Sequence, residues 1–67
     1  MTLPDALIAE CIRVRDEIMP AYLEIGISGK PALAMMRAEL DQAYRALAYQ
    51  DATSQIQLLE SLRGYTG

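Results

Sequence analysis

The chain has 67 residues, of which 52% are hydrophobic, and it carries a formal net charge of −3. This length fits one domain covering residues 1–67, and a chain this short buries only about 60% of its unfolded surface, so a lone protomer is marginally stable. Small folds usually gain support from disulfides, a metal or a second subunit. Because the chain has one cysteine and no histidine, a disulfide within the chain and a zinc site are both excluded, and no cofactor is expected. Self-association remains as the simplest support.

The charged residues also argue against nucleic acid as a partner. One lysine and five arginines are spread along the chain among nine carboxylates, which argues against nucleic-acid binding, because phosphate contacts need clustered cations. The acidic balance suits a basic protein partner, although a charge of −3 is also ordinary for solubility.

No apolar run approaches the ~20 residues that cross a bilayer, so no membrane span is expected. A single reduced cysteine and the absence of a signal-like N-terminus favour the cytoplasm.

The first helix is predicted to run from Thr2 to Ile25. Thr2 can cap it, Pro4 fits its first turn, and the glycine that follows Ile25 is a plausible left-handed cap at its end. Pro20 interrupts the pattern and allows either one kinked helix or two separate helices. The apolar stripe continues past Pro20, which favours the kinked helix.

This first helix has an apolar face that spans roughly 200° of the helical wheel. One partner helix cannot cover so wide a face, so part of it is predicted to pair with a second copy of the chain. The residues assigned to this oligomer interface are Ile8, Cys11, Ile12, Met19 and Leu23. A thiol on such a face is usually an inert small hydrophobe, which argues against a reactive role for Cys11.

Arg15 falls inside this apolar arc, beside Tyr22. A guanidinium there needs a carboxylate, a carbonyl or an anionic ligand. Three interpretations stay open: an arginine that reaches solvent or pairs with a carboxylate, a recessed anion site built by Arg15 with Tyr22, and a contact point for another protein. The second interpretation assumes that a spacing of seven residues puts both side chains on the same side of the helix.

Two further helices are predicted after a turn at residues 26–30. The first, near residues 31–50, has an apolar seam of alternating three- and four-residue spacings, and the second runs over 52–63 behind an N-cap at Asp51. Their short connection predicts antiparallel neighbours. In the last helix Ile56, Leu59 and Leu62 are expected to face the core, with Leu58 at its edge. The turn lacks the spacing of a phosphate loop.

The four tyrosines lie on or beside apolar faces, in a chain that has no tryptophan or phenylalanine. Tyrosine suits positions that are buried at one end and hydrated at the other, as at interfaces, although the edge of a core is an equally good explanation. Tyr22, Tyr44 and Tyr49 are therefore candidate binding residues together with Arg15.

The sequence thus predicts an all-α fold in which a long Pro-kinked first helix packs on an antiparallel pair of helices, with two protomers forming a homodimer. We expect a non-enzymatic protein–protein interaction module, such as a small adaptor, subunit or inhibitor, possibly of phage type. The alternative is an oligomeric binder of a small anionic ligand, such as a nucleotide, centred on Arg15 and Tyr22. Catalysis is not expected, because no histidine is available as a base and the neighbouring carboxylates do not face each other.

Overall fold

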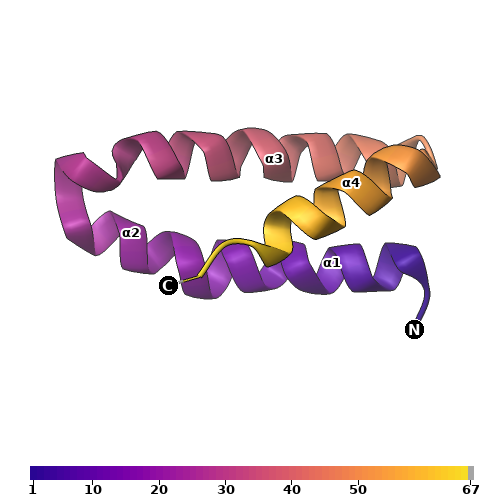
Figure 1. The fold of residues 1–67 in the computed structure, drawn as a ribbon, viewed down its shortest axis with the longest axis horizontal. Helices are drawn as coiled ribbons and strands as arrows, with labels where there is room; N and C mark the ends of the chain where they lie inside the picture. Colours follow the sequence, from indigo (N-terminus) through magenta and orange to yellow (C-terminus); the bar gives the residue numbers. More distant parts are fainter. Residues whose placement is uncertain (67) are drawn as a thin grey trace.

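The computed structural model describes residues 1–66, which form helices and turns without a strand. The prediction of an all-α fold is therefore confirmed for the described part of the chain (Figure 1). The elements in chain order are α1 (Leu3–Arg13), the π-helical η1 (Val14–Ile18), α2 (Met19–Ile25), the 3₁₀ turn η2 (Gly26–Gly29), α3 (Lys30–Ala48) and α4 (Ala52–Arg63).

Side-chain caps fix the beginnings of two helices. The Thr2 hydroxyl accepts the backbone N–H of Asp5 at 3.2 Å. The Asp51 carboxylate accepts the backbone N–H of Ser54 at 3.2 Å and its hydroxyl at 2.7 Å. Both N-caps predicted from the sequence are confirmed, and each satisfies a backbone donor that has no partner within its own helix.

The irregularity expected at Pro20 takes the form of a π-helical segment directly before it. Proline has no N–H, and its ring clashes with the carbonyl four residues earlier, here that of Asp16. The widened turn of η1 meets this requirement, and the N–H of Met19 bonds the carbonyl of Val14, five residues back. The chain stays helical from Leu3 to Ile25. The wider turn also rotates the faces of α2 relative to those of α1.

A tight turn then reverses the chain. Gly26 adopts a positive φ of 83°, and an added Cβ on Gly29 would lie 2.3 Å from the carbonyl oxygen of Tyr22. Glycine is therefore required at both positions, at one for the backbone angle and at the other for the close approach. As a result α3 returns antiparallel to α1 and α2 (Figure 1).

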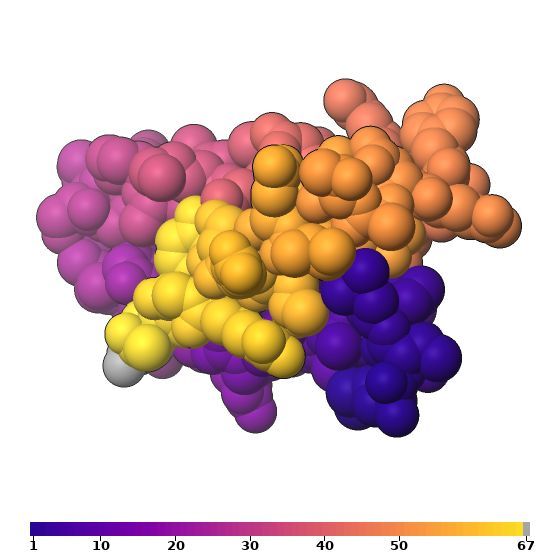
Figure 2. Space-filling view, turned by 45° about the vertical axis from the view of Figure 1, so that its right-hand side comes forward, coloured from indigo at the N-terminus to yellow at the C-terminus, as the bar shows by residue number. Residues whose placement is uncertain are grey.

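Helix α4 lies obliquely across the seam between α1 and α3, on one side of that pair (Figures 1 and 2). The core forms where the three helices meet. Its buried residues are Leu7, Cys11, Val14, Ile18, Met36, Leu40, Ala43, Ala46, Leu58, Leu59 and Leu62.

The inner face of α4 differs from the predicted one. Leu58 is buried although an edge position was expected, and Ile56 is exposed although a core position was expected. Gln55 is buried beside these residues, and its amide donates to the carbonyl of Ala46 at 3.0 Å. This carbonyl lies near the end of α3 and satisfies the buried amide. With Gln55 on the inner face of α4, the next residue, Ile56, points outward.

Candidate interaction surface

The α1–α3 pair has two sides, and α4 covers one of them. Glu10 and Arg13 of α1 turn toward α4, whereas Ile8 and Ile12 lie on the other flank of the buried stripe. No other segment among residues 1–66 lies over that flank. The uncovered surface, called the open face below, consists of Ile8, Ile12, Arg15 and Tyr44.

Three large side chains of the open face are about half exposed. The exposed fractions are 44% for Ile8, 45% for Ile12 and 45% for Tyr44. Two of them come from α1 and one from α3, so both helices contribute. Single exposed apolar side chains are ordinary, and these three are singled out because they share one face of the molecule.

Arg15 lies at the edge of this apolar group and is paired within its own helix. Its Nε donates to Asp16 Oδ1 at 2.7 Å and its Nη2 to Asp16 Oδ2 at 3.0 Å. The Arg15 guanidinium holds the pKa of the Asp16 carboxyl below its usual range. The Arg15 side chain is 55% exposed. This matches the first of the three interpretations of Arg15, an arginine that reaches solvent or pairs with a carboxylate, because the next residue supplies that carboxylate.

The interpretation as an anion site groups Arg15 with Tyr22, but the two side chains have different partners in the protomer. Tyr22 faces the C-terminal segment, where its hydroxyl donates to the carbonyl of Thr66 at 3.3 Å. Arg15 instead lies beside Tyr44: the Asp16 carboxylate raises the pKa of the guanidinium most, and the Tyr44 hydroxyl adds a smaller contribution. The reason is the π-helical turn between the two positions, which breaks the regular spacing on which the prediction depends.

The remaining predicted site residues fall in different places. Cys11 is buried in the core of its own protomer, so it has no surface to offer a second copy, and burial raises the pKa of its thiol. Met19 packs against the core and is partly buried. Leu23 is exposed on α2, and Tyr49 is exposed just after α3. Of the predicted interface residues, Ile8 and Ile12 are the two that share the open face.

Tyr49 lines a groove of about 410 Å³ between α3 and α4. Arg45 and two carboxylates, Glu39 and Asp51, also line it, so charges of both signs are mixed there. The Asp51 carboxylate is already bound by Ser54, and Glu39 accepts a hydrogen bond from Ser61. The polar groups of this groove thus hold α3 and α4 together.

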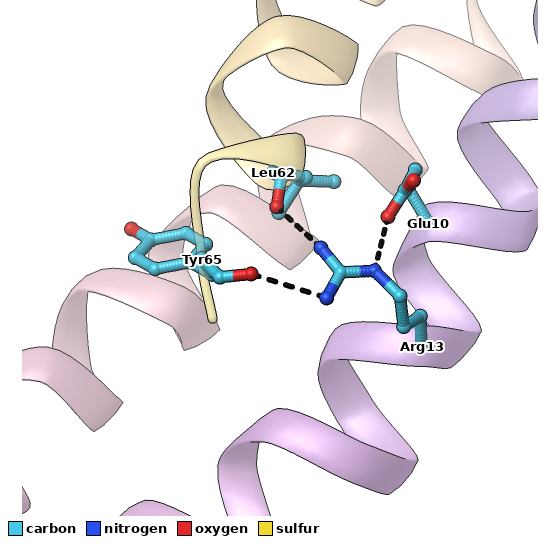
Figure 3. A network of polar contacts seen from close by, with 4 residues as sticks. All are labelled: Glu10, Arg13, Leu62 and Tyr65. Carbon is cyan, nitrogen blue, oxygen red and sulfur yellow. Dashed lines mark hydrogen bonds and ion pairs between the residues drawn. The ribbon is translucent and has the colours of Figure 1, made fainter. Parts of the chain in front are cut away.

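The covered side contains a polar network that sequence reasoning missed (Figure 3). Arg13 donates to Glu10 Oε2 at 2.6 Å, to the carbonyl of Leu62 at 3.0 Å and to the carbonyl of Tyr65 at 3.1 Å. These carbonyls lie at and just beyond the end of α4, where intrahelical donors run out. Arg13 therefore caps α4 from a different helix.

Tyr65 strengthens the same end of the molecule. It is partly buried and packs against the core. Burial is the main cause that raises the pKa of Tyr65 to about 12, and the nearby Glu39 carboxylate adds to it. The C-terminal turn is thus fastened to α1 through Arg13.

Residues 1–66 hold no group of three histidine, cysteine, aspartate or glutamate side chains arranged to bind a metal ion. None of the described helices combines the length and the apolar character needed to cross a membrane. Comparisons with protein-family models, with curated proteins and with solved structures found no match for this chain. The open face is therefore the feature of the molecule that bears on its function.

Proposed function

We propose that this chain is a non-enzymatic protein–protein interaction module that acts as a helical homo-oligomer, with a dimer as its basic unit. In this proposal the protomer is the first helix, bent at Pro20, packed on the α3–α4 pair. The open face supplies its contact surface.

One observation carries the proposal. After α4 has closed one side of the α1–α3 pair, Ile8, Ile12 and Tyr44 are still about half exposed on the other side. Water contact with this apolar surface costs roughly 25 cal/mol per Å², and a marginally stable domain of this size gains from burying it. A partner on the open face supplies that burial.

The module is best described as a small adaptor, subunit or inhibitor, possibly of phage type. Its net charge of −3 favours a basic protein as a further partner through electrostatic attraction. We place it in the cytoplasm, where its one cysteine stays reduced.

A second candidate function is the binding of a small anionic ligand, such as a nucleotide, by the oligomer. The observation that favours it is the meeting of Arg15 and Tyr44 on the open face, from different helices. A guanidinium beside a phenol can bind phosphate and stack against a base. Tyr22 does not belong to this version of the site, because its hydroxyl is bound at the C-terminal segment.

Sedimentation equilibrium over a hundredfold range of protein concentration tests the proposed homo-oligomer. We expect a mass of at least twice 7.4 kDa at the upper end, decreasing toward the protomer on dilution. A protomer mass throughout would remove the homo-oligomer from the proposal.

Thermal denaturation with a panel of phosphates and nucleotides tests the anion-binding alternative. We expect a ligand of this class to raise the melting temperature of the wild type and to have a smaller effect on Arg15→Ala, because ligands that bind the native state stabilise it. The absence of any shift across the panel would exclude this alternative.

A further inference from the structure

We propose that the open face binds the same face of a second copy about a two-fold axis, with the two α1 helices antiparallel and crossing midway between Ile8 and Ile12. Each Arg15 then faces Asp5 of the other copy. This inference depends on the proposed homo-oligomer and specifies its geometry.

The seam on α1 has the spacing of a helix–helix contact. Asp5, Ile8, Ile12 and Arg15 follow one another at intervals of three, four and three residues, which places them in one row along the helix. Ala9 lies beside this row and is exposed, so its small side chain permits close approach of a second helix. Asp5, Ile8 and Ile12 lie within α1, and Arg15 is the second residue of the π-helical segment that follows it.

The charges at the two ends of the row are complementary to each other. Asp5 lies in the first turn of α1, Arg15 lies just beyond its end, and the side chains between them in the row are apolar. An antiparallel second copy therefore brings a carboxylate opposite a guanidinium at both ends of the contact. A parallel copy would place like charges opposite each other.

The positions of the row are spaced evenly about its centre, so a two-fold axis through that centre places each residue of the row opposite a residue of the other copy. When two such helices cross midway between Ile8 and Ile12, Ile8 of one copy lies opposite Ile12 of the other, and Asp5 lies opposite Arg15. Tyr44 stands beside Arg15 and borders the contact on the α3 side. The Asp16 carboxylate stays next to Arg15, so the guanidinium is satisfied with or without the second copy.

The dimensions of the molecule set an upper limit on this contact. The molecule measures 35 × 19 × 16 Å, and α1 and α3 extend along the longest dimension. A contact that covered a whole side of 35 × 19 Å would approach the ~800 Å² per partner of a standard interface.

A charge exchange across the seam tests this geometry. We expect Asp5→Arg alone and Arg15→Asp alone each to weaken dimer formation about tenfold or more, because each places like charges opposite each other. The double variant should recover most of the lost affinity. The control is Glu60→Arg on the exposed side of α4, which should leave the dimer dissociation constant within twofold of the wild type. Circular dichroism checks that each variant keeps its helix content.

A second pair of variants tests the apolar centre. Ile12→Arg should give a folded protomer at concentrations where the wild type is a dimer, whereas Ile56→Arg, on the exposed side of α4, should remain a dimer.

The possible outcomes separate this inference from the proposed function. A wild-type dimer that tolerates Ile12→Arg would overturn the open-face interface while leaving the homo-oligomer in place. Single charge variants without effect, or a double variant without recovery, would overturn the antiparallel Asp5–Arg15 pairing. A wild type that is a protomer at every concentration would overturn both proposals.

Discussion

Two arginines separated by one residue have opposite surroundings in this molecule. Arg13 points to the covered side, where its guanidinium joins Glu10 and two carbonyl groups at the end of α4, and its side chain is 30% exposed. Arg15 points to the open face, pairs with its neighbour Asp16 and is 55% exposed. The comparison shows that the position of α4 decides which arginine is structural and which is available to a partner.

The largest expected effect comes from removing the apolar contact that holds α4 on the covered side. Leu62→Ala should reduce the free energy of unfolding by about 2–5 kcal/mol, because Leu62 is fully buried and the change leaves a cavity. In a domain of this size each kcal/mol lowers the melting temperature by roughly 4–8 °C. Thermal melts followed by circular dichroism measure the loss. Ile56→Ala on the same helix is the matched control, and equal losses in the two variants would show that α4 is not docked through Leu62.

The next effect separates the two arginines. Arg13→Ala should lower the free energy of unfolding by about 1–3 kcal/mol, because it removes the charged donor that binds the carbonyls of Leu62 and Tyr65 at the end of α4. Arg15→Ala should leave the unfolding of the dilute protomer unchanged, since its guanidinium is exposed. Urea denaturation of dilute protein measures both variants. A larger loss for Arg15→Ala would reverse the assignment of the two sides.

Dimer formation, unlike the unfolding of the protomer, should depend on Arg15. Arg15→Ala should weaken dimer formation several-fold, whereas Arg37→Ala on α3 should have little effect, because Arg37 lies outside the row that runs from Asp5 to Arg15. Light scattering at two concentrations compares them. Negligible effects in both variants would remove any special role of Arg15.

The smallest effect concerns the cap of α4 and depends on pH. Hydrogen bonds from Ser54 lower the pKa of the Asp51 carboxyl below its usual value of about 3.9. The stabilisation from the ionised cap is therefore fully present above pH ~4 and is lost as the pH falls through the lowered folded-state pKa. Asp51→Asn keeps a capping oxygen but should lack this part of the acid transition. Identical pH profiles of melting temperature for both proteins would contradict this role.

The sequence predicted the features that depend on local patterns. The all-α class and the caps at Thr2 and Asp51 follow from side-chain preferences within a few residues, and the structure confirms them. Ile8 and Ile12, assigned from the same local pattern to an oligomer interface, are about half exposed in the protomer, and the interface itself stays a prediction.

The features that failed depend on three-dimensional context. The relation of Arg15 to Tyr22 assumed a regular helix, and the π-helical turn before Pro20 changed it. The capping role of Arg13 was missed because Arg13 looks like one more residue on a polar face, and the position at which α4 ends is not a local property. The sequence predicts only that the last carbonyls of α4 need donors from elsewhere, as in any helix, and this does not indicate which arginine supplies them.

The most direct test of the two-sided account is a pair of ¹H–¹⁵N NMR spectra, recorded above and below the concentration at which the oligomer dissociates. Dilution should change the backbone chemical shifts of Ile8, Ile12, Arg15 and Tyr44 and leave the chemical shifts of Arg13, Ile56 and Leu62 unchanged. Shifts concentrated on α4, or no shifts on the open face while the mass changes, would contradict it.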